Sequence, residues 1–482
     1  MSGTPLRVLA VASEGFPFIK TGGLADVVGA LPAALAPEGV AVTTLLPGYP
    51  PVMAAAVAGF ETVETLPDLF GGHARLLAAR MAGREMLVVD APHLFARGGS
   101  PYQQPGGAEW GDNAIRFAAF GYAAAQAARR MGFDAVHAHD WQAGLTPAYL
   151  RYSGSAIPTL FTIHNLAFQG RYPATLFSAL GLPSEAFQTG GLEYFGGVGY
   201  LKSGIWFSDR ITTVSPGYAA EIRTPQGGMG LDGLLRGRGA ELCGVLNGLD
   251  TEEWDPAADT RLSARFNAAT ADLRQRNKLE LQARMGLNQD AGAPLLAFVG
   301  RLAWQKGVDL ILEALPFILG QGAQLAILGS GEPELEARVH GATASLAGRV
   351  GSFLGFEEGL ARLCYGGADI FLMPSRFEPC GLGQLCALRY GALPVVSHVG
   401  GLGDTVIDAN EMALAAGTGT GFTFAPVTAE MLGLTIERAI GLYRDPTAWA
   451  GLQANAMGCD VSWARSARRY ATLFREMVAA RA

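Results

Sequence analysis

Short, uninterrupted apolar runs recur along the chain, and each is followed by a loop and then by a helical pattern. Clear examples are Leu6–Ser13, Thr159–Asn165 and Asp369–Ser375. Continuous rather than alternating apolarity is typical of strands that are buried on both faces of a parallel sheet. Their alternation with helices indicates right-handed βαβ crossovers. The pattern therefore predicts the α/β class, with doubly wound parallel sheets.

The apolar runs fall into two series, separated by the polar, turn-rich segment Asn247–Asp259. A chain of 482 residues is also long enough for two or three domains. We therefore expect two Rossmann-like domains that face each other across a central cleft, with Asn247–Asp259 as the hinge. The first would comprise residues 1–246, completed by a C-terminal helix at 463–482, and the second residues 247–462.

Composition excludes several classes of partner. The net charge of −7 provides no bulk positive field for nucleic acid, although it leaves room for a local positive pocket that binds a small anion. No apolar run is long enough to span a bilayer. The five cysteines form no CxxC pair, which fits reduced thiols and the cytoplasm. We expect no nucleic-acid partner and no membrane association.

One short kernel, Gly-Gly-Leu-x-Asp-x-Val, occurs twice, within Lys20–Gly29 and His398–Asp408. Gly22-Gly23 and Gly400-Gly401 each lie between a predicted strand and a predicted helix. At such a junction, backbone amides and a helix N-terminus can hold an anion or sugar hydroxyls. Either loop alone could equally be a tight turn without a ligand. Two matching loops on two sheets favour one shared ligand cleft.

These residues also resemble a known family. The segments "KTGGLADVVGALPAAL", "HAHDWQAGL", "TIHNLAFQG", "VGRLAWQKGVDL" and "PSRFEPCGLGQLCALRYGALPVV" occur in order and are similar to those of bacterial glycogen synthases and plant starch synthases. The resemblance implies the two-Rossmann (GT-B) fold. It also implies transfer of glucose from ADP-glucose to the non-reducing end of an α-1,4-glucan such as glycogen, with retention of configuration and without a cofactor.

The departure of a nucleoside diphosphate builds negative charge, which an enzyme must stabilise with a metal or with fixed cations. The sequence has no Asp-x-Asp motif, but Arg301 and Lys306 follow a predicted strand. Spacing alone would also fit a solvated loop pair, whereas the resemblance implies that both hold the diphosphate. It likewise implies that Glu378 binds the donor glucose. An ion pair with Arg376 is the alternative for Glu378.

The resemblance also implies site residues in the first domain. It places His164 against the donor sugar, with Asn165 beside it, and it makes Asp140 the comparable polar residue on the preceding strand end. Lys20 is expected to reach the donor from this side. His137 and His139 look like metal ligands, but we see no third ligand in the sequence and predict no metal site.

Three rival functions remain open at this level. A glucosyltransferase that prefers UDP-glucose would carry the same motifs, because the base pocket is spread over the second domain. A catalytically impaired glucan-binding protein is disfavoured by the retained Lys20, Arg301, Lys306 and Glu378. An NAD-dependent oxidoreductase is disfavoured because no Gly-x-Gly-x-x-Gly follows the first strand.

Overall fold

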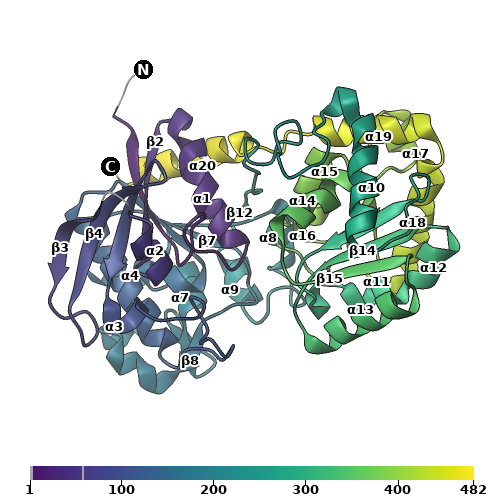
Figure 1. Ribbon diagram of the computed structural model, residues 1–482. Coiled ribbons are helices and arrows are strands. Elements are labelled where there is room, and N and C mark those ends of the chain that lie inside the picture. The colour runs from purple at the N-terminus through teal and green to yellow at the C-terminus, as the bar shows by residue number, and fades with distance from the viewer. Residues whose placement is uncertain (1–3, 57–58, 482) are drawn as a thin grey trace. The chain divides into compact units, whose positions relative to one another are not determined.

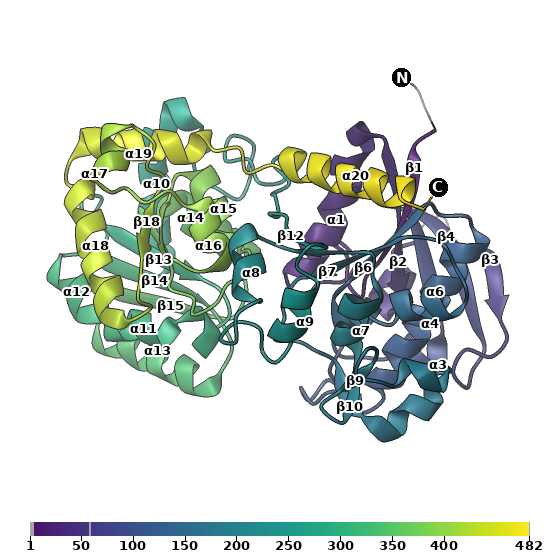
Figure 2. The same cartoon turned by 180° about the vertical axis from the view of Figure 1, so that it is seen from behind.

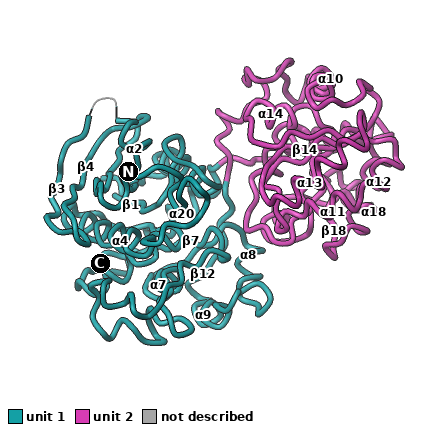
Figure 3. Tube along the Cα trace, turned by 60° about the horizontal axis from the view of Figure 1, so that its bottom comes forward, with its two compact units in different colours: residues 1–247, 463–482 teal, residues 248–462 magenta. Residues whose placement is uncertain are grey.

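The computed structural model describes residues 4–56 and 59–481 (Figure 1). The chain divides into two compact units, which Figure 3 shows in different colours. The first unit comprises residues 1–247 and 463–482, and the second comprises residues 248–462. The chain therefore crosses between the units twice, and the C-terminal segment belongs to the first.

The first unit is built on a nine-stranded sheet. Its strand order is β12-β11-β7-β6-β1-β2-β5-β4-β3. All neighbours from β12 to β5 pair in parallel, and β4 pairs antiparallel with both β5 and β3. The strands are β1 (Leu6–Val11), β2 (Val40–Pro47), β3 (Glu61–Leu66), β4 (Ala74–Met81), β5 (Arg84–Asp90), β6 (Ala135–His139), β7 (Thr159–Ile163), β11 (Arg210–Thr213) and β12 (Leu242–Gly244).

Helices cover both faces of this sheet (Figures 1 and 2). They are α1 (Gly23–Leu35), α2 (Pro50–Ala54), α3 (Pro92–Phe95), α4 (Asn113–Arg130), α5 (Asp140–Ala143), α6 (Thr146–Tyr152), α7 (Tyr200–Phe207), α8 (Pro216–Glu221), α9 (Asp232–Gly237) and α20 (Ala464–Ala479). A small antiparallel sheet joins β8 (Arg171–Pro173), β10 (Gly197–Gly199) and β9 (Glu193–Tyr194). Tyr470 and Phe474 of α20 pack with Leu31 of α1, so the last helix completes this core.

The second unit is built on a six-stranded parallel sheet. Its order is β15-β14-β13-β16-β17-β18, which is the 3-2-1-4-5-6 order of a dinucleotide-binding fold. The strands are β13 (Leu295–Val299), β14 (Gln324–Gly329), β15 (Val350–Leu354), β16 (Ile370–Met373), β17 (Leu393–Ser397) and β18 (Phe422–Phe424). Strands β13, β14, β16 and β17 are almost wholly buried, as their unbroken apolar runs predict.

The helices of the second unit lie on both faces of its sheet (Figure 1). They are α10 (Arg274–Arg284), α11 (Val308–Glu313), α12 (Leu315–Gly320), α13 (Pro333–Ser345), α14 (Glu358–Gly367), α15 (Gly383–Tyr390), α16 (Gly400–Thr405), α17 (Glu411–Ala415), α18 (Ala429–Tyr443) and α19 (Pro446–Gly458). The predicted class, two doubly wound Rossmann-like units, is thus confirmed. Within the described ranges no helix combines the length and apolarity needed to cross a bilayer.

Each sheet has a switch point, where successive strands are added first on one side and then on the other. In the first unit it lies between β1 and β6, and in the second between β13 and β16. Open α/β sheets bind ligands outside the carboxyl ends of the strands at this point. The loops that follow these four strands are therefore the places to look for a functional site.

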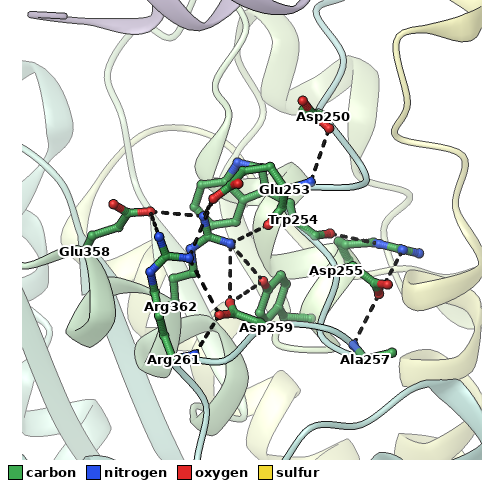
Figure 4. Close-up of polar contacts among 11 residues, drawn as sticks. Asp250, Glu253, Trp254, Asp255, Ala257, Asp259, Arg261, Glu358 and Arg362 are labelled. Atoms are coloured by element: carbon green, nitrogen blue, oxygen red, sulfur yellow. Dashed lines mark hydrogen bonds and ion pairs between the residues drawn. The ribbon is translucent and has the colours of Figure 1, made fainter. Parts of the chain in front are cut away.

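The predicted hinge segment, Asn247–Asp259, leads into the second unit, and its second half is held by contacts with that unit. Arg362, which is 1% exposed, donates to Asp259 Oδ2 at 3.3 Å, and its guanidinium lies 4.0 Å from the Trp254 ring (Figure 4). Arg362 also bonds to Glu253. The segment is therefore fastened to the second unit from Glu253 onward, because a buried arginine needs these partners.

We expect Arg362→Met to destabilise the second unit by about 3–5 kcal/mol. The buried Asp259 carboxylate would lose its buried counter-charge and keep only the partly exposed Arg261 at 3.9 Å. Arg389→Met is the matched control: Arg389 pairs with Asp255 at 3.2 Å, and about a third of each side chain is exposed. Such a pair is worth about 0–1 kcal/mol. Differential scanning calorimetry of both variants provides the comparison. Equal shifts in the melting temperature would contradict the anchoring role of Arg362.

Candidate active site

The second unit gathers two cations and a carboxylate at the switch point of its sheet. Arg301 follows β13, Lys306 ends a short 3₁₀ turn, and Glu378 follows β16. Gly307, with φ of 69°, lets these loops approach, since a Cβ there would lie 2.1 Å from the carbonyl oxygen of Pro374. Only glycine allows so close a contact in this backbone conformation.

Lys306 and Glu378 form an ion pair. Lys306 Nζ lies 2.5 Å from Glu378 Oε2, and Ser375 Oγ donates to the same oxygen at 3.0 Å. The Glu378 side chain is 8% exposed and that of Lys306 is 21% exposed. A polyanionic ligand that attracted the lysine would leave this carboxylate free to accept hydrogen bonds from another group.

The alternative pairing of Glu378 with Arg376 is wrong. Arg376 instead holds Asp309 through two hydrogen bonds of 2.6 and 2.8 Å, and its guanidinium lies 4.4 Å from the Trp304 ring centroid. These bonds from Arg376 lower the pKa of Asp309. Arg376 is therefore a structural residue of the loop, and the Glu378 carboxylate is left to Lys306.

Arg301 and the second Gly-Gly loop flank this pair. Arg301 is exposed and contacts Gln305 Oε1 at 3.3 Å. Gly401 donates its backbone N–H to the carbonyl of Glu378 at 3.1 Å, and a Cβ on Gly401 would lie 2.4 Å from the Cα of Cys380. The amide of Gly401 is thus engaged within the protein. This loop serves to hold the Glu378 segment rather than to offer that amide to a ligand.

The first Gly-Gly loop is likewise occupied by a group of the chain itself. The buried Glu14, which follows β1, accepts hydrogen bonds from the backbone N–H of Thr21, from Thr21 Oγ1 at 2.6 Å and from the Gly22 amide at 3.3 Å. Tyr102 OH donates to the same carboxylate. The Gly22 amide therefore already has a carboxyl oxygen of the chain itself as its partner. Binding of a ligand at Gly22-Gly23 stays a prediction.

Lys20 is placed at the edge of this loop. Its Nζ lies 2.6 Å from Asp26 Oδ1, and about half of its side chain is exposed. Burial raises the pKa of Asp26, and the charge of Lys20 opposes that rise. Asp26 belongs to the repeated kernel, so the kernel's carboxylate fixes the lysine in this copy. Lys20 keeps an exposed ammonium face toward solvent.

Asp140 follows β6 and holds the end of the neighbouring strand β7. Its Oδ1 accepts the backbone N–H of His164 at 2.7 Å and that of Asn165 at 3.4 Å. Burial raises the pKa of Asp140 to about 7, although these two bonds oppose the rise. The backbone φ of Asp140 is 56°, in the left-handed region. Strain of this kind is common at functional sites.

Three histidines lie in a row at the same strand ends. His139 Nδ1 and His164 Nε2 are 2.9 Å apart, and the rings of His137 and His139 are 3.9 Å apart. Burial lowers the pKa of His137 and of His164 to about 3, so both are neutral. His164 is the third histidine that the sequence could not place beside the other two. In the described part of the chain, no three metal-ligating side chains form a cation site.

The sequence analysis assigned no role to Glu14 or Tyr102. Glu14 is buried and Tyr102 is half-buried, and burial together with the neighbouring Glu14 raises the pKa of Tyr102. The available signal was position: Glu14 is the first charged residue after the carboxyl end of β1, where a switch point lies. A buried acid there required partners, and the polar side chains of the following loop supply them.

Comparison with known proteins agrees with this geometry. Residues 7–237 match the starch synthase catalytic domain family, and residues 293–439 match the glycosyl transferases group 1 family. The catalytic domain of starch synthase IV from Arabidopsis thaliana, solved bound to ADP and acarbose, is 32% identical, covers 99% of this chain and 100% of its own, and superposes with a TM-score of 0.89. The fold and its switch-point residues define a glycosyltransferase of the two-Rossmann (GT-B) class.

The full-length relatives are more similar still. Glycogen synthase of Rhodopseudomonas palustris strain BisB18 is 55% identical over 99% of both chains. Glycogen synthase of Acidiphilium cryptum is 57% identical over 98% of this chain and 99% of its own. The chain belongs to the glycogen and starch synthase family, which confirms the resemblance seen in the sequence.

The high pKa of Asp140 predicts a pH dependence of stability. The folded chain keeps this proton up to about pH 7, whereas an unfolded aspartate, with a model value of 3.8, releases it earlier. Stability that is fully present below about pH 4 is therefore lost as the pH rises toward 7, by at most about 1.4 kcal/mol per unit. Asp140→Asn should lack this loss.

The free energy of unfolding of wild type and Asp140→Asn is measured with denaturant between pH 4 and 7. Unfolding is monitored by hydrogen exchange at the amides of β6 and β7. A gap between wild type and variant that stays constant over this range would contradict the assigned pKa.

Proposed function

We propose that this protein transfers glucose from ADP-glucose to the non-reducing end of an α-1,4-glucan, with retention of configuration and release of ADP, in glycogen biosynthesis. The observation that carries the proposal is the identity of 55–57% to curated glycogen synthases over nearly the whole of both chains. The ADP bound to the Arabidopsis starch synthase supports the nucleotide. No observation favours the alternatives, which are a UDP-glucose donor and a catalytically impaired glucan binder.

The donor's diphosphate would bind to Lys306 and Arg301. In the ligand-free chain Lys306 is held by Glu378 at 2.5 Å. A diphosphate carries more negative charge than one carboxylate, so it competes for the lysine and draws Nζ away from Glu378. The carboxylate, fixed by Ser375, then becomes available to the glucose hydroxyls or to positive charge that develops on the sugar.

Glucose transfer would proceed on one face of the sugar. The bond between the anomeric carbon and the phosphate oxygen breaks with its electrons moving to ADP, and an acceptor hydroxyl attacks from the same side. Its proton passes to the departing phosphate oxygen. Asp140 supports this step indirectly, since it fixes the backbone of His164 and Asn165 at the end of β7. Neutral His164 leaves no fixed cation there to repel the developing oxocarbenium charge.

The two units would divide the substrates between them. We assign the donor to the second unit and the glucan acceptor to the first, with Lys20 reaching the donor from the first. The cations Arg301 and Lys306 support the donor assignment, and buried neutral or acidic groups support an uncharged acceptor. Within the described residues no disulfide joins any of the five cysteines, which agrees with the cytoplasmic location that we propose.

A direct assay tests the reaction. Incorporation of labelled glucose into glycogen should require ADP-glucose and should persist in EDTA, because Lys306 and Arg301 can neutralise the leaving diphosphate. Faster turnover with UDP-glucose would favour the rival donor. Activity that is lost in EDTA and restored only by Mg²⁺ or Mn²⁺ would overturn the metal-free assignment, and failure with both donors would favour the glucan binder.

Variants of the ion pair should separate binding from turnover. Lys306→Ala should lower kcat/KM about tenfold to a hundredfold and weaken ADP inhibition, since a hydrogen bond between charged groups contributes about 1.5–3 kcal/mol. Glu378→Gln should lower kcat sharply and leave ADP binding nearly unchanged. Arg338→Ala, at an exposed arginine of α13, is the control. Parallel losses of turnover and of ADP affinity in Glu378→Gln would contradict its role on the sugar.

A further inference from the structure

Three large apolar side chains of the first unit stand exposed within one small region. Phe168 is 54% exposed, Phe195 is 65% exposed and Met229 is 38% exposed. We call these three residues the apolar platform. Exposed apolar side chains that gather in one place commonly mark a binding surface, whereas isolated ones need no explanation.

Contacts between three separate segments hold the platform together. Gln169 Nε2 donates to the carbonyl of Met229 at 3.0 Å, and Tyr194 OH donates to the same oxygen at 3.2 Å. The rings of Tyr194 and Phe195 are 4.7 Å apart. A Cβ on Gly230 would lie 3.2 Å from the Phe195 ring, which places that ring against the residue after Met229. These contacts hold the three segments of the platform in one defined arrangement.

The backbone at the platform is strained. Phe195 has φ of 48° and Met229 has φ of 47°, both in the left-handed region that residues with large side chains rarely adopt. In the free protein the strained Phe195 leaves 65% of its surface exposed, and Met229 leaves 38% exposed. A conformation that costs free energy and leaves an apolar group in water indicates that a ligand supplies the missing contact.

The platform begins next to the candidate active site. Strand β7 ends at Ile163 and is followed by His164 and Asn165. The backbone N–H of Phe168 donates to the carbonyl of Asn165 at 3.2 Å. The turn that carries His164 and Asn165 therefore continues directly into the platform, within one unit. A ligand chain that starts at the active site could extend over it.

We propose that the platform binds the glucan acceptor, holding glucose residues that are several units away from the growing end. The rings of an α-glucan present apolar C–H faces, which stack on aromatic side chains, and hydroxyl groups at their edges. Polar groups suited to those hydroxyls lie beside the platform, since Arg171 lies 5.8 Å from the Phe195 ring and Gln169 reaches Met229. The inference rests on the proposed function and adds the path of the acceptor chain.

Acceptor length tests the platform. Phe195→Asn removes the ring with a residue that tolerates the left-handed region, and Phe168→Ala removes the second ring. Each should raise the KM for maltoheptaose about tenfold, the value of one well-packed aromatic contact. The KM for maltotriose, the KM for ADP-glucose and kcat should stay unchanged. Phe195→Tyr, which keeps a ring, and Trp206→Ala, at an exposed aromatic outside the platform, are the matched controls.

Three outcomes would overturn the platform. The first is a KM that is unchanged for both acceptors, and the second is a KM that rises equally for both. The third is an oligomer, found by light scattering, that Phe195→Asn dissociates without any change in KM; this surface would then be a contact between copies of the chain. Retardation by glycogen in native gels separates the two proposals. If the wild type is inactive but glycogen retards it, and the retardation is weaker for Phe195→Asn, the proposed reaction is wrong and the platform is supported.

Discussion

One ion pair, Lys306 with Glu378, organises the candidate site of the second unit. A carboxylate that is 8% exposed is costly to bury without a counter-charge, and the lysine at 2.5 Å supplies it. The surrounding features serve this contact. Gly307 brings the lysine loop against the end of β16, and Gly401 holds the backbone of Glu378. In the reaction that we propose, the pair exchanges partners, and the diphosphate replaces the carboxylate as the partner of the lysine.

The first unit carries a different set of side chains at the switch point of its sheet. Its strand ends carry the buried acids Glu14 and Asp140 and neutral histidines, and none of these offers a cation to a phosphate. Such groups suit an uncharged sugar chain, which needs hydrogen bonds and apolar faces. Both sheets have a switch point, but the side chains at the two switch points differ in charge. This difference supports the proposed division between donor and acceptor.

Much of this could be predicted from the sequence, for a physical reason. Strands such as β7 and β16 are buried on both faces, so their residues are apolar without interruption, and polar residues such as His164 and Glu378 mark the ends where ligands bind. Family resemblance then supplied roles that spacing alone left open. What stayed hidden were contacts between distant residues.

The hidden contacts depend on tertiary placement. Lys306 and Glu378 are 72 positions apart, and local spacing pointed to Arg376 instead. The repeated glycine kernels predicted backbone amides that are available to a ligand. In the structure the Gly22 amide donates to Glu14, and the Gly401 amide donates to the carbonyl of Glu378. Polar composition predicted a hinge over Asn247–Asp259, but it did not show that the buried Arg362 holds Asp259 against the second unit.

The central claim is that a nucleoside diphosphate exchanges with Glu378 for Lys306, and the most direct test is a crystal structure of the protein with bound ADP. The account predicts that Lys306 Nζ lies within hydrogen-bond distance of a phosphate oxygen and has left Glu378, while Ser375 still donates to the carboxylate. A structure in which ADP is bound and the Lys306–Glu378 pair remains closed would contradict the exchange.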